Sequence, residues 1–278
     1  MHSSQFTEQC LNGEREFEYI TVEGHIEKTA LNQLKLKEVI FENCYFEEVD
    51  LSHSEFKGVA FHRCAFNQVK FHQSTFQHTS FKNTSFTHAS FEEADLESTS
   101  FRQCRFVKAN FSQSDCRKSQ FFQCELSQGD FQNARIHLMQ IYQSNLKHSN
   151  WHLAQVHSLS FYQNTSDYTD WSSVVINSAT FLHSRLTCSN FQKSVLREVD
   201  FNRADLEGSD LSESCLDYCR FDQTNLNNTC LNGAELYEVF CYKTELRSSW
   251  LQRADLDQVK FHQCPLKILY LSSPVEPI

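Results

Sequence analysis

The sequence contains little glycine and proline, and it has no long apolar run. Its 278 residues include only 6 Gly and 3 Pro, which excludes collagen-like and low-complexity chains. No segment approaches the roughly 18 consecutive apolar residues that a membrane-spanning helix requires, and no basic segment followed by an apolar one marks a secretory signal. We therefore expect no membrane contact and a cytoplasmic location, in which the 12 Cys remain reduced thiols.

The chain also lacks the motifs that usually carry catalysis. There is no Gly-rich phosphate loop, no Gly-x-Ser-x-Gly motif and no His-Glu-x-x-His motif. The Cys and His residues do not have the spacing of a zinc site, and the spaced pair His137 and His157 has no evident third ligand. The sequence thus predicts a protein that is not an enzyme, with no catalytic residues, no cofactor and no metal.

What the chain does contain is phenylalanine at a fixed interval. From Leu31 to Leu271 every fifth residue is large and apolar, except Cys116, Ser166 and Cys241. Nearly all of the 25 Phe lie on this series. A helix would repeat its apolar positions every 3.6 residues and a strand every 2, so neither element explains a period of five.

A second series, of small or slim residues such as Cys44, Val49 and Ser54, lies two positions before the first. Two inward residues in every five fit a coil that turns a corner after each five residues, with backbone pairing between successive coils. Residues 20 positions apart are mostly alike. Phe fills nearly every position that is reached in steps of 20 from Phe41 to Phe261. The predicted fold class is therefore all-β: a four-sided parallel β-helix, or β-solenoid, of about 12 coils of 20 residues.

Several five-residue units resemble a known repeat. They are Ala94-Asp95-Leu96, Ala109-Asn110-Phe111, Ala204-Asp205-Leu206, Ala234-Glu235-Leu236 and Ala254-Asp255-Leu256. These units are similar to the A(D/N)LXX unit of the pentapeptide repeat family, and the resemblance covers residues 31–271. It implies a right-handed quadrilateral β-helix. The resemblance to the quinolone-resistance members of the family is weaker. Those members are acidic, resemble duplex DNA in width and charge, and bind DNA gyrase.

The two ends depart from the repeat. Residues 1–30 follow the series loosely and are expected to form an N-terminal cap that is partly in register, because a solenoid end must cover its last coil. The continuous β-helix is expected over residues 31–271, and a C-terminal tail over 272–278. Apolar residues near this end either cover the last coil or join two copies in a homodimer. These residues are Tyr270, Leu271 and Val275.

The net charge of −10 is unevenly distributed. Residues 1–60 hold 12 acidic and 5 basic residues, residues 61–190 hold 9 and 11, and residues 191–278 hold 14 and 9. An acidic surface can occupy a positively charged groove that is built for phosphates. The C-terminal stretch is therefore the candidate partner-binding surface, through its outward acidic residues. They are Asp205, Glu207, Asp210, Glu213, Asp217 and Asp222.

One stretch of the repeat is irregular. Met139 and Leu159 are oversized for the small series, and Asn164 and Ser166 place polar groups at two successive inward positions just before Trp171. Buried polar groups need hydrogen-bond partners. This stretch is expected either to repack, with a bulge or bonds to the backbone, or to form a kink that a partner recognises.

Taken together, the sequence predicts a non-enzymatic solenoid that binds a protein partner. The most specific form of this hypothesis is a DNA mimic that binds DNA gyrase or another topoisomerase and confers resistance to quinolones or a toxin. It involves no direct contact with nucleic acid. The alternatives are a bacterial effector injected into a host, and a general interaction scaffold with another partner.

Overall fold

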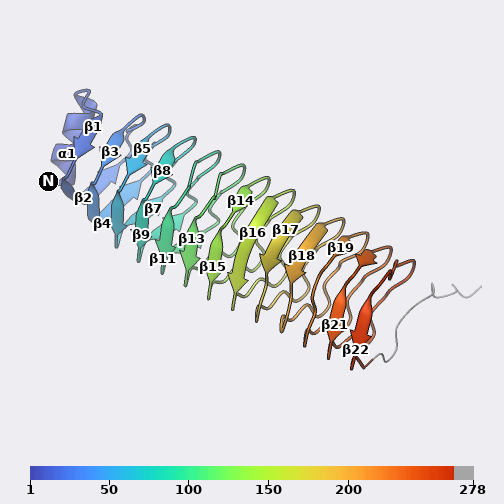
Figure 1. The fold of residues 1–278 in the computed structure, drawn as a ribbon. Helices are drawn as coiled ribbons and strands as arrows, with labels where there is room; N and C mark the ends of the chain where they lie inside the picture. The colour runs from blue at the N-terminus through green and yellow to red at the C-terminus, as the bar shows by residue number, and fades with distance from the viewer. Residues whose placement is uncertain (266–278) are drawn as a thin grey trace, which may run out of the picture. The chain divides into compact units, whose positions relative to one another are not determined.

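The structure is a computed structural model that describes residues 1–265, and it divides into two compact units. Unit 1 spans Met1–Leu146 and unit 2 spans Lys147–Ile278. Within each unit, short parallel strands pair with strands about 20 residues away, as in Phe61↔Phe81 and Leu196↔Leu216. Figure 1 shows these strands as successive rungs. The predicted parallel β-solenoid is therefore confirmed.

Unit 1 begins with a helix and continues with short strands. The elements are α1 (Ser3–Leu11), β1 (Glu16–Glu18), β2 (Thr21–Glu27), β3 (Lys35–Lys37), β4 (Ile40–Glu47), β5 (Glu55–Lys57), β6 (Ala60–His62), β7 (Ala65–Asn67), β8 (Thr75–Gln77), β9 (Ser80–Lys82), β10 (Ser85–Thr87), β11 (Ser100–Arg102), β12 (Arg105–Val107), β13 (Gln120–Phe122), β14 (Arg135–His137) and β15 (Gln140–Tyr142). They pair in the orders β1-β3-β5-β8, β4-β6-β9-β11-β13-β15 and β4-β7-β10-β12, and β2 also pairs with β4. Strand β4 runs around a corner, so it pairs with β6 on one side and with β7 on the next.

Unit 2 contains longer strands that run around a corner. The elements are β16 (Gln155–Tyr162), β17 (Val175–Thr180), β18 (Val195–Asp200), β19 (Cys215–Asp217), β20 (Glu235–Tyr237), β21 (Phe240–Tyr242) and β22 (Lys260–His262). Strands β16 to β20 pair in sequence order, and β21 pairs with β22. No helix in the described part of the chain is long and apolar enough to cross a membrane.

The corners of the coil explain why the period is five. In each unit the residue two positions after the large inward residue has a left-handed backbone, as in Asn43 (φ 52°), Gln103 (φ 55°) and Tyr218 (φ 56°). Left-handed backbone is uncommon for residues other than glycine and costs on the order of 1 kcal/mol. The chain accepts this cost at almost every corner, which explains how it turns so often with so few glycines.

The inward series form the core of each unit. In unit 1 the phenylalanine rings stack face to face from coil to coil, with centroids 4.7 Å apart for Phe61 and Phe81 and 4.9 Å for Phe81 and Phe101. Fully burying such a side chain contributes roughly 1.5–3 kcal/mol. In unit 2 leucine replaces phenylalanine on most sides, while Phe181 and Phe201 still stack at 5.1 Å.

The small inward series has a second role, as hydrogen-bond donor. The Cys64 Sγ and Thr84 Oγ1 atoms each donate to a main-chain carbonyl oxygen of the adjacent coil, over 3.3 Å in both cases. The acceptors are Phe41 and Phe61 respectively. A buried hydroxyl or thiol at this position is thus satisfied by the backbone of the neighbouring coil, which explains why Ser, Thr and Cys alternate with Ala and Val.

The first coil of unit 1 is one residue short, which explains why the series is shifted before Ile26. Glu16 pairs with Lys35 and Val22 with Phe41, whereas Gly24 pairs with Cys44 after a register shift. Phe17 and Val22 are consequently the inward residues. The short coil lies against helix α1.

Helix α1 packs on this coil through a single aromatic side chain. The Phe6 ring lies 4.7 Å from that of Phe17 and 5.7 Å from that of Phe41. Gly24 permits the close approach, because its φ is +111° and a Cβ atom there would lie 2.6 Å from the Ser3 Oγ. The boundaries expected at residues 30 and 271 remain predictions, and the tail 272–278 lies outside the described residues, as do Tyr270, Leu271 and Val275.

Candidate functional site

Each five-residue unit presents three side chains to solvent, and residues 20 apart share a side. The six acidic residues proposed from the sequence therefore do not lie together. Asp205 and Glu207 lie on the side of Leu206, Asp210 and Glu213 on that of Leu211, Asp217 on that of Leu216, and Asp222 on that of Phe221. They follow one another around the coil and so occupy four different sides.

Two of these carboxylates also have a structural role. The Asp205 Oδ1 accepts a hydrogen bond from the Glu207 main-chain nitrogen over 3.2 Å, and the Asp210 Oδ1 accepts one from Ser212 over 2.9 Å. Short side chains of Asp and Asn stabilise turns in this way. The Asp205 and Asp210 carboxylates thus already accept hydrogen bonds from main-chain nitrogens of their own coils.

Three more of the six have a basic neighbour. The Glu213 carboxylate lies 3.8 Å from the Lys193 Nζ, Asp217 lies 3.3 Å from the Arg197 Nε, and Asp222 lies 3.2 Å from the Arg220 Nη2. Exposed pairs of this kind contribute little to stability. They do reduce the local negative charge that these three residues can present to a partner.

A denser set of carboxylates lies along a single side of unit 2, and we call it the acidic face. It consists of Glu198, Asp217, Tyr218, Glu235, Tyr237, Glu238, Asp255 and Asp257. Its residues lie side by side on adjacent coils, where Asp217 pairs with Tyr237 and Glu235 pairs with Asp255. Arg197 is the only basic residue among the outward positions of this side from Val195 to Gln258. Six carboxylates within four coils create a strongly negative surface.

Two tyrosines lie among these carboxylates. The rings of Tyr218 and Tyr237 meet edge to face with centroids 5.6 Å apart. A hydrogen bond with Glu238, together with the charge of that carboxylate, raises the pKa of Tyr237, so this phenol remains neutral. Tyr218 occupies a left-handed corner and is 49% exposed. Aromatic and acidic groups are thus presented together.

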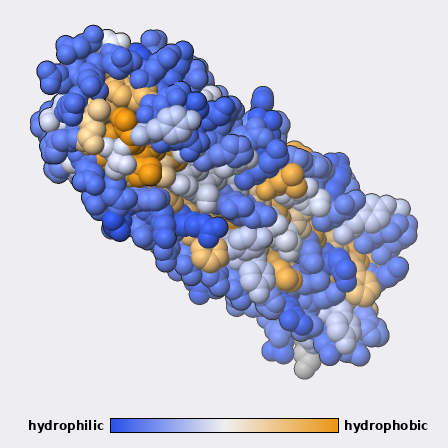
Figure 2. Space-filling view, turned by 60° about the vertical axis from the view of Figure 1, so that its left-hand side comes forward, coloured by the Kyte–Doolittle hydropathy of each residue, from blue (hydrophilic) through white to orange (hydrophobic). Residues whose placement is uncertain are grey.

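Toward the start of unit 2, one of the three outward columns of this side is largely apolar. Val175, Val195 and Cys215 form one column of outward residues on β17, β18 and β19. Burial, and then the Asp217 carboxylate, raise the pKa of the Cys215 thiol, so it stays neutral. This short apolar column leads to Glu235 of the acidic face, whereas the surface seen in Figure 2 is mainly hydrophilic.

The irregular stretch keeps the corner geometry of a regular coil. Gln163, Tyr168 and Ser173 keep the left-handed corners of a regular coil, so no bulge forms. The Ser166 Oγ and Thr169 Oγ1 are hydrogen-bonded over 2.8 Å.

The backbone of the next coil also takes part in this packing. The Asn164 main-chain nitrogen donates to the Ser184 Oγ over 3.2 Å. The Trp171 ring stacks 4.6 Å from that of Trp151. Met139 in unit 1 and Leu159 in unit 2 are both buried. These residues belong to the core and do not form an exposed site.

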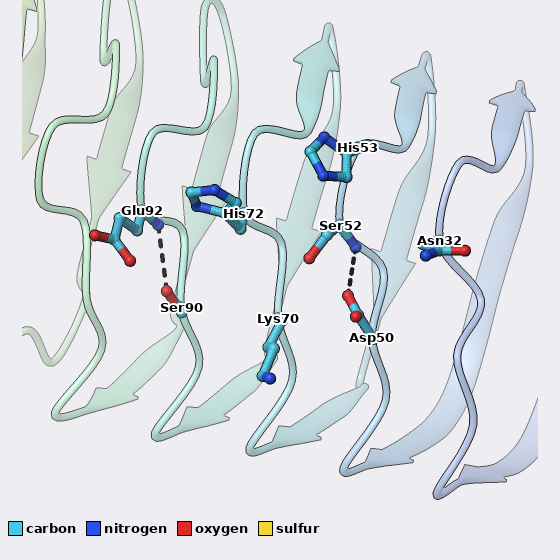
Figure 3. A pocket seen from close by; sticks show the side chains of 8 residues that line it. All are labelled: Asn32, Asp50, Ser52, His53, Lys70, His72, Ser90 and Glu92. Carbon is cyan, nitrogen blue, oxygen red and sulfur yellow. Dashed lines mark hydrogen bonds between the residues drawn. The ribbon is translucent and has the colours of Figure 1, made fainter.

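A shallow groove of about 470 Å³ lies on the side of Leu51 in unit 1. Figure 3 shows His53 and His72 above Asp50 and Lys70, with Asp50 accepting a bond from the Ser52 main-chain nitrogen over 2.9 Å. Acidic and basic groups alternate along it, and it has no deep wall. Among the described residues no three His, Cys, Asp or Glu side chains are placed to hold a metal ion.

The fold and the acidic face define the molecule as a β-solenoid that presents its chemistry on flat outer sides. Residues 25–91 and 94–171 match the profile described as a pentapeptide repeat region, and residues 176–212 and 204–240 match pentapeptide repeats. The chain therefore belongs to the pentapeptide repeat family. Members of this family are typically non-enzymatic binding scaffolds. No curated protein matches the chain.

Several solved structures are similar in fold. A trypsin-treated variant of QnrB1, a plasmid-mediated fluoroquinolone resistance protein, is 22% identical and has a TM-score of 0.44, covering 66% of this chain and 91% of its own. A pentapeptide repeat protein from the thylakoid lumen of Arabidopsis thaliana is 30% identical over 33% of this chain and 63% of its own, with a TM-score of 0.32. HetL, a pentapeptide repeat protein of the cyanobacterium Nostoc, is 16% identical and covers 98% of this chain and 97% of its own, with a TM-score of 0.26.

Proposed function

We propose that the chain binds a protein partner through the acidic face of unit 2, and that this partner presents a basic surface of the kind that holds DNA phosphates. The observation that carries the proposal is the alignment of six carboxylates on one side against a single arginine. Aligned charges of one sign raise the local potential and accelerate encounter with an oppositely charged groove. The proposal places this activity in the cytoplasm, where the described free thiols suit a reducing environment.

Tyr218 supports this choice of surface. A bulky aromatic residue at a left-handed corner (φ 56°) is unfavourable in itself, and about half of the Tyr218 side chain remains exposed. Tyrosine is among the side chains that anchor protein interfaces. We infer that Tyr218 and Tyr237 contact the partner, with the surrounding carboxylates pairing with its lysines and arginines.

DNA gyrase is the first partner to test, because the family resemblance points to it. We would titrate the purified chain into a gyrase supercoiling assay, with and without ciprofloxacin. The proposal predicts either inhibition of supercoiling or protection from the drug at micromolar protein. It also predicts that the effect weakens as salt is raised, because exposed charges are screened.

Matched charge reversals would locate the surface. The variant Glu235→Lys, Glu238→Lys, Asp257→Lys reverses three of the six charges of the acidic face. It should raise the protein concentration that is needed for the effect at least tenfold. The control Glu207→Lys, Glu213→Lys, Glu245→Lys makes the same change in net charge on two other sides of unit 2, and should retain most of it. Equal losses in both variants would show that net charge, rather than this side, matters; no effect of the parent chain on gyrase would remove gyrase as the partner.

A further inference from the structure

One side of unit 1 has the opposite character, and we call it the basic face. It consists of His62, Arg63, Lys82, Arg102, Phe122 and Tyr142, on strands β6, β9, β11, β13 and β15 and the corners that follow them. From Ala60 to Gln143 no outward position of this side is acidic. Such a stretch is unexpected in a chain that has 35 acidic and 25 basic residues.

Its cations and aromatic rings form one continuous column. His62 pairs with Lys82, Lys82 with Arg102, Arg102 with Phe122, and Phe122 with Tyr142 on successive coils. Coils stack at a spacing of about 4.8 Å. The Arg102 guanidinium carbon lies 5.8 Å from the centroid of the Phe122 ring, so the positive and the aromatic parts of the column are in contact.

The cations at the centre of this column are not neutralised. At its start the Glu42 carboxylate accepts from the His62 Nδ1 over 3.2 Å and also pairs with Arg63. Neither Lys82 nor Arg102 forms an ion pair within the described residues, and both are exposed. Two adjacent coils therefore present positive charge that the fold leaves available.

Amide side chains flank the aromatic part of the column. The Gln103 Nε2 donates to the Gln123 Oε1 over 3.4 Å, and the Gln123 Nε2 donates to the Gln143 Oε1 over 3.3 Å. On the other flank the Gln120 Nε2 donates to the Gln140 Oε1 over 3.3 Å. Gln103 and Gln120 act only as donors in these bonds, and an amide side chain also has an acceptor oxygen. The rings are thus bordered by groups that can bond to the edges of bases.

We propose that the basic face binds a single-stranded nucleic acid, with phosphates at Lys82 and Arg102 and a base stacked on Phe122 or Tyr142. Proteins that bind single strands combine positive charge along the backbone with aromatic platforms for the bases. A flat side has no element that could enter a duplex groove. An acidic peptide would use the cations but would leave the aromatic and amide groups without a role. The expectation of no direct contact with nucleic acid belongs to the DNA-mimic hypothesis, and the proposal for this face departs from it.

Binding of fluorescein-labelled oligothymidylate to the full chain, followed by fluorescence anisotropy, tests this inference. Two neutralised phosphates predict a slope of about −1.4 in log K against log salt. The variant Lys82→Ala, Arg102→Ala should bind at least tenfold more weakly and lose this slope. Phe122→Ala should weaken binding about tenfold but keep the slope, because stacking is not screened by salt.

The matched control is Arg105→Ala, Lys108→Ala, which removes an equal number of positive charges from the adjacent side of unit 1. This variant should bind as the parent does. Circular dichroism would confirm that each variant remains folded. Absence of binding by the parent chain at low salt, or equal weakening in the control, would overturn the proposal. Displacement of the oligonucleotide by polyglutamate, combined with no effect of Phe122→Ala, would identify an acidic-polypeptide site instead. The gyrase proposal rests on the acidic face of unit 2, whereas this one rests on the basic face of unit 1. Either proposal can therefore fail without the other.

Discussion

Unit 1 and unit 2 obey the same five-residue rule but fill it with different side chains. Unit 1 has a core of stacked phenylalanine rings and one side that is free of acidic residues from Ala60 to Gln143, whereas unit 2 has leucine at many of its large inward positions and one side dense in carboxylates. The inward positions determine the fold, and they tolerate a change from Phe to Leu. The outward positions are free of that constraint, so one repeat can carry two surfaces of opposite charge.

The largest difference between the units should be seen on truncating their phenylalanines. The Phe81 ring stacks on two neighbours, meets Phe86 edge to face at 5.3 Å and lies at a tilt to Phe76 at 6.0 Å. Leucines occupy the corresponding places beside Phe201, which keeps an edge-to-face contact with Phe191 at 6.1 Å. We expect Phe81→Ala to cost about 4–5 kcal/mol and Phe201→Ala about 3 kcal/mol, since each aromatic pair adds roughly 0.5–1.5 kcal/mol. Urea denaturation measures both, and equal losses would contradict the role of the edge-on contacts.

The next effect concerns how unit 2 accommodates a missing large residue. Ser166 occupies a large inward position, and the neighbouring large position holds Trp171, which we interpret as a compensation in volume. Trp171→Leu should cost about 2–4 kcal/mol through a cavity, and Ser166→Leu about 1–3 kcal/mol through overpacking. The double variant should cost less than the sum of the two. Additive losses in this double-mutant cycle would show that the two sites do not share space.

Buried thiols should make both units less stable in alkali. Burial raises the pKa of Cys116 in unit 1 and of Cys219 in unit 2 from 9.0 to about 12. Because the folded-state pKa is raised, the contribution of each thiol is fully present below pH 9 and is lost as the pH rises from 9 toward 12. Each thiol should therefore lower the free energy of unfolding by about 1 kcal/mol between pH 9 and 10. Denaturation of Cys219→Ala at both pH values measures this contribution; an unchanged pH dependence would contradict it.

The sequence predicted the fold well because the inward series is strictly periodic, and this period survives every change of residue. The grouping of the outward residues was not evident from the sequence, because residues that are adjacent in sequence turn onto different sides. Asp205 and Asp210 lie on different sides, whereas Glu235 and Asp255 lie on one. Reading the outward residues in columns of 20 would have found the acidic face. The one-residue deficit that places Phe17 and Val22 inward depends on the packing of helix α1, and no local pattern shows it.

The smallest effect concerns the corners, where function and stability are expected to diverge. Tyr218 is exposed at a left-handed corner of the acidic face, while the corner residue Gln103 of unit 1 is polar, as at most corners. Asparagine tolerates this backbone better than a bulky aromatic residue, so Tyr218→Asn should raise the free energy of unfolding by about 0.5 kcal/mol. Gln103→Asn, as the matched control, should change it less. The same Tyr218→Asn variant should weaken partner binding, because it removes an aromatic anchor without altering charge. A variant that is both less stable and unchanged in binding would mean that Tyr218 is held by packing within the coil, and the case for the acidic face would then rest on its carboxylates alone.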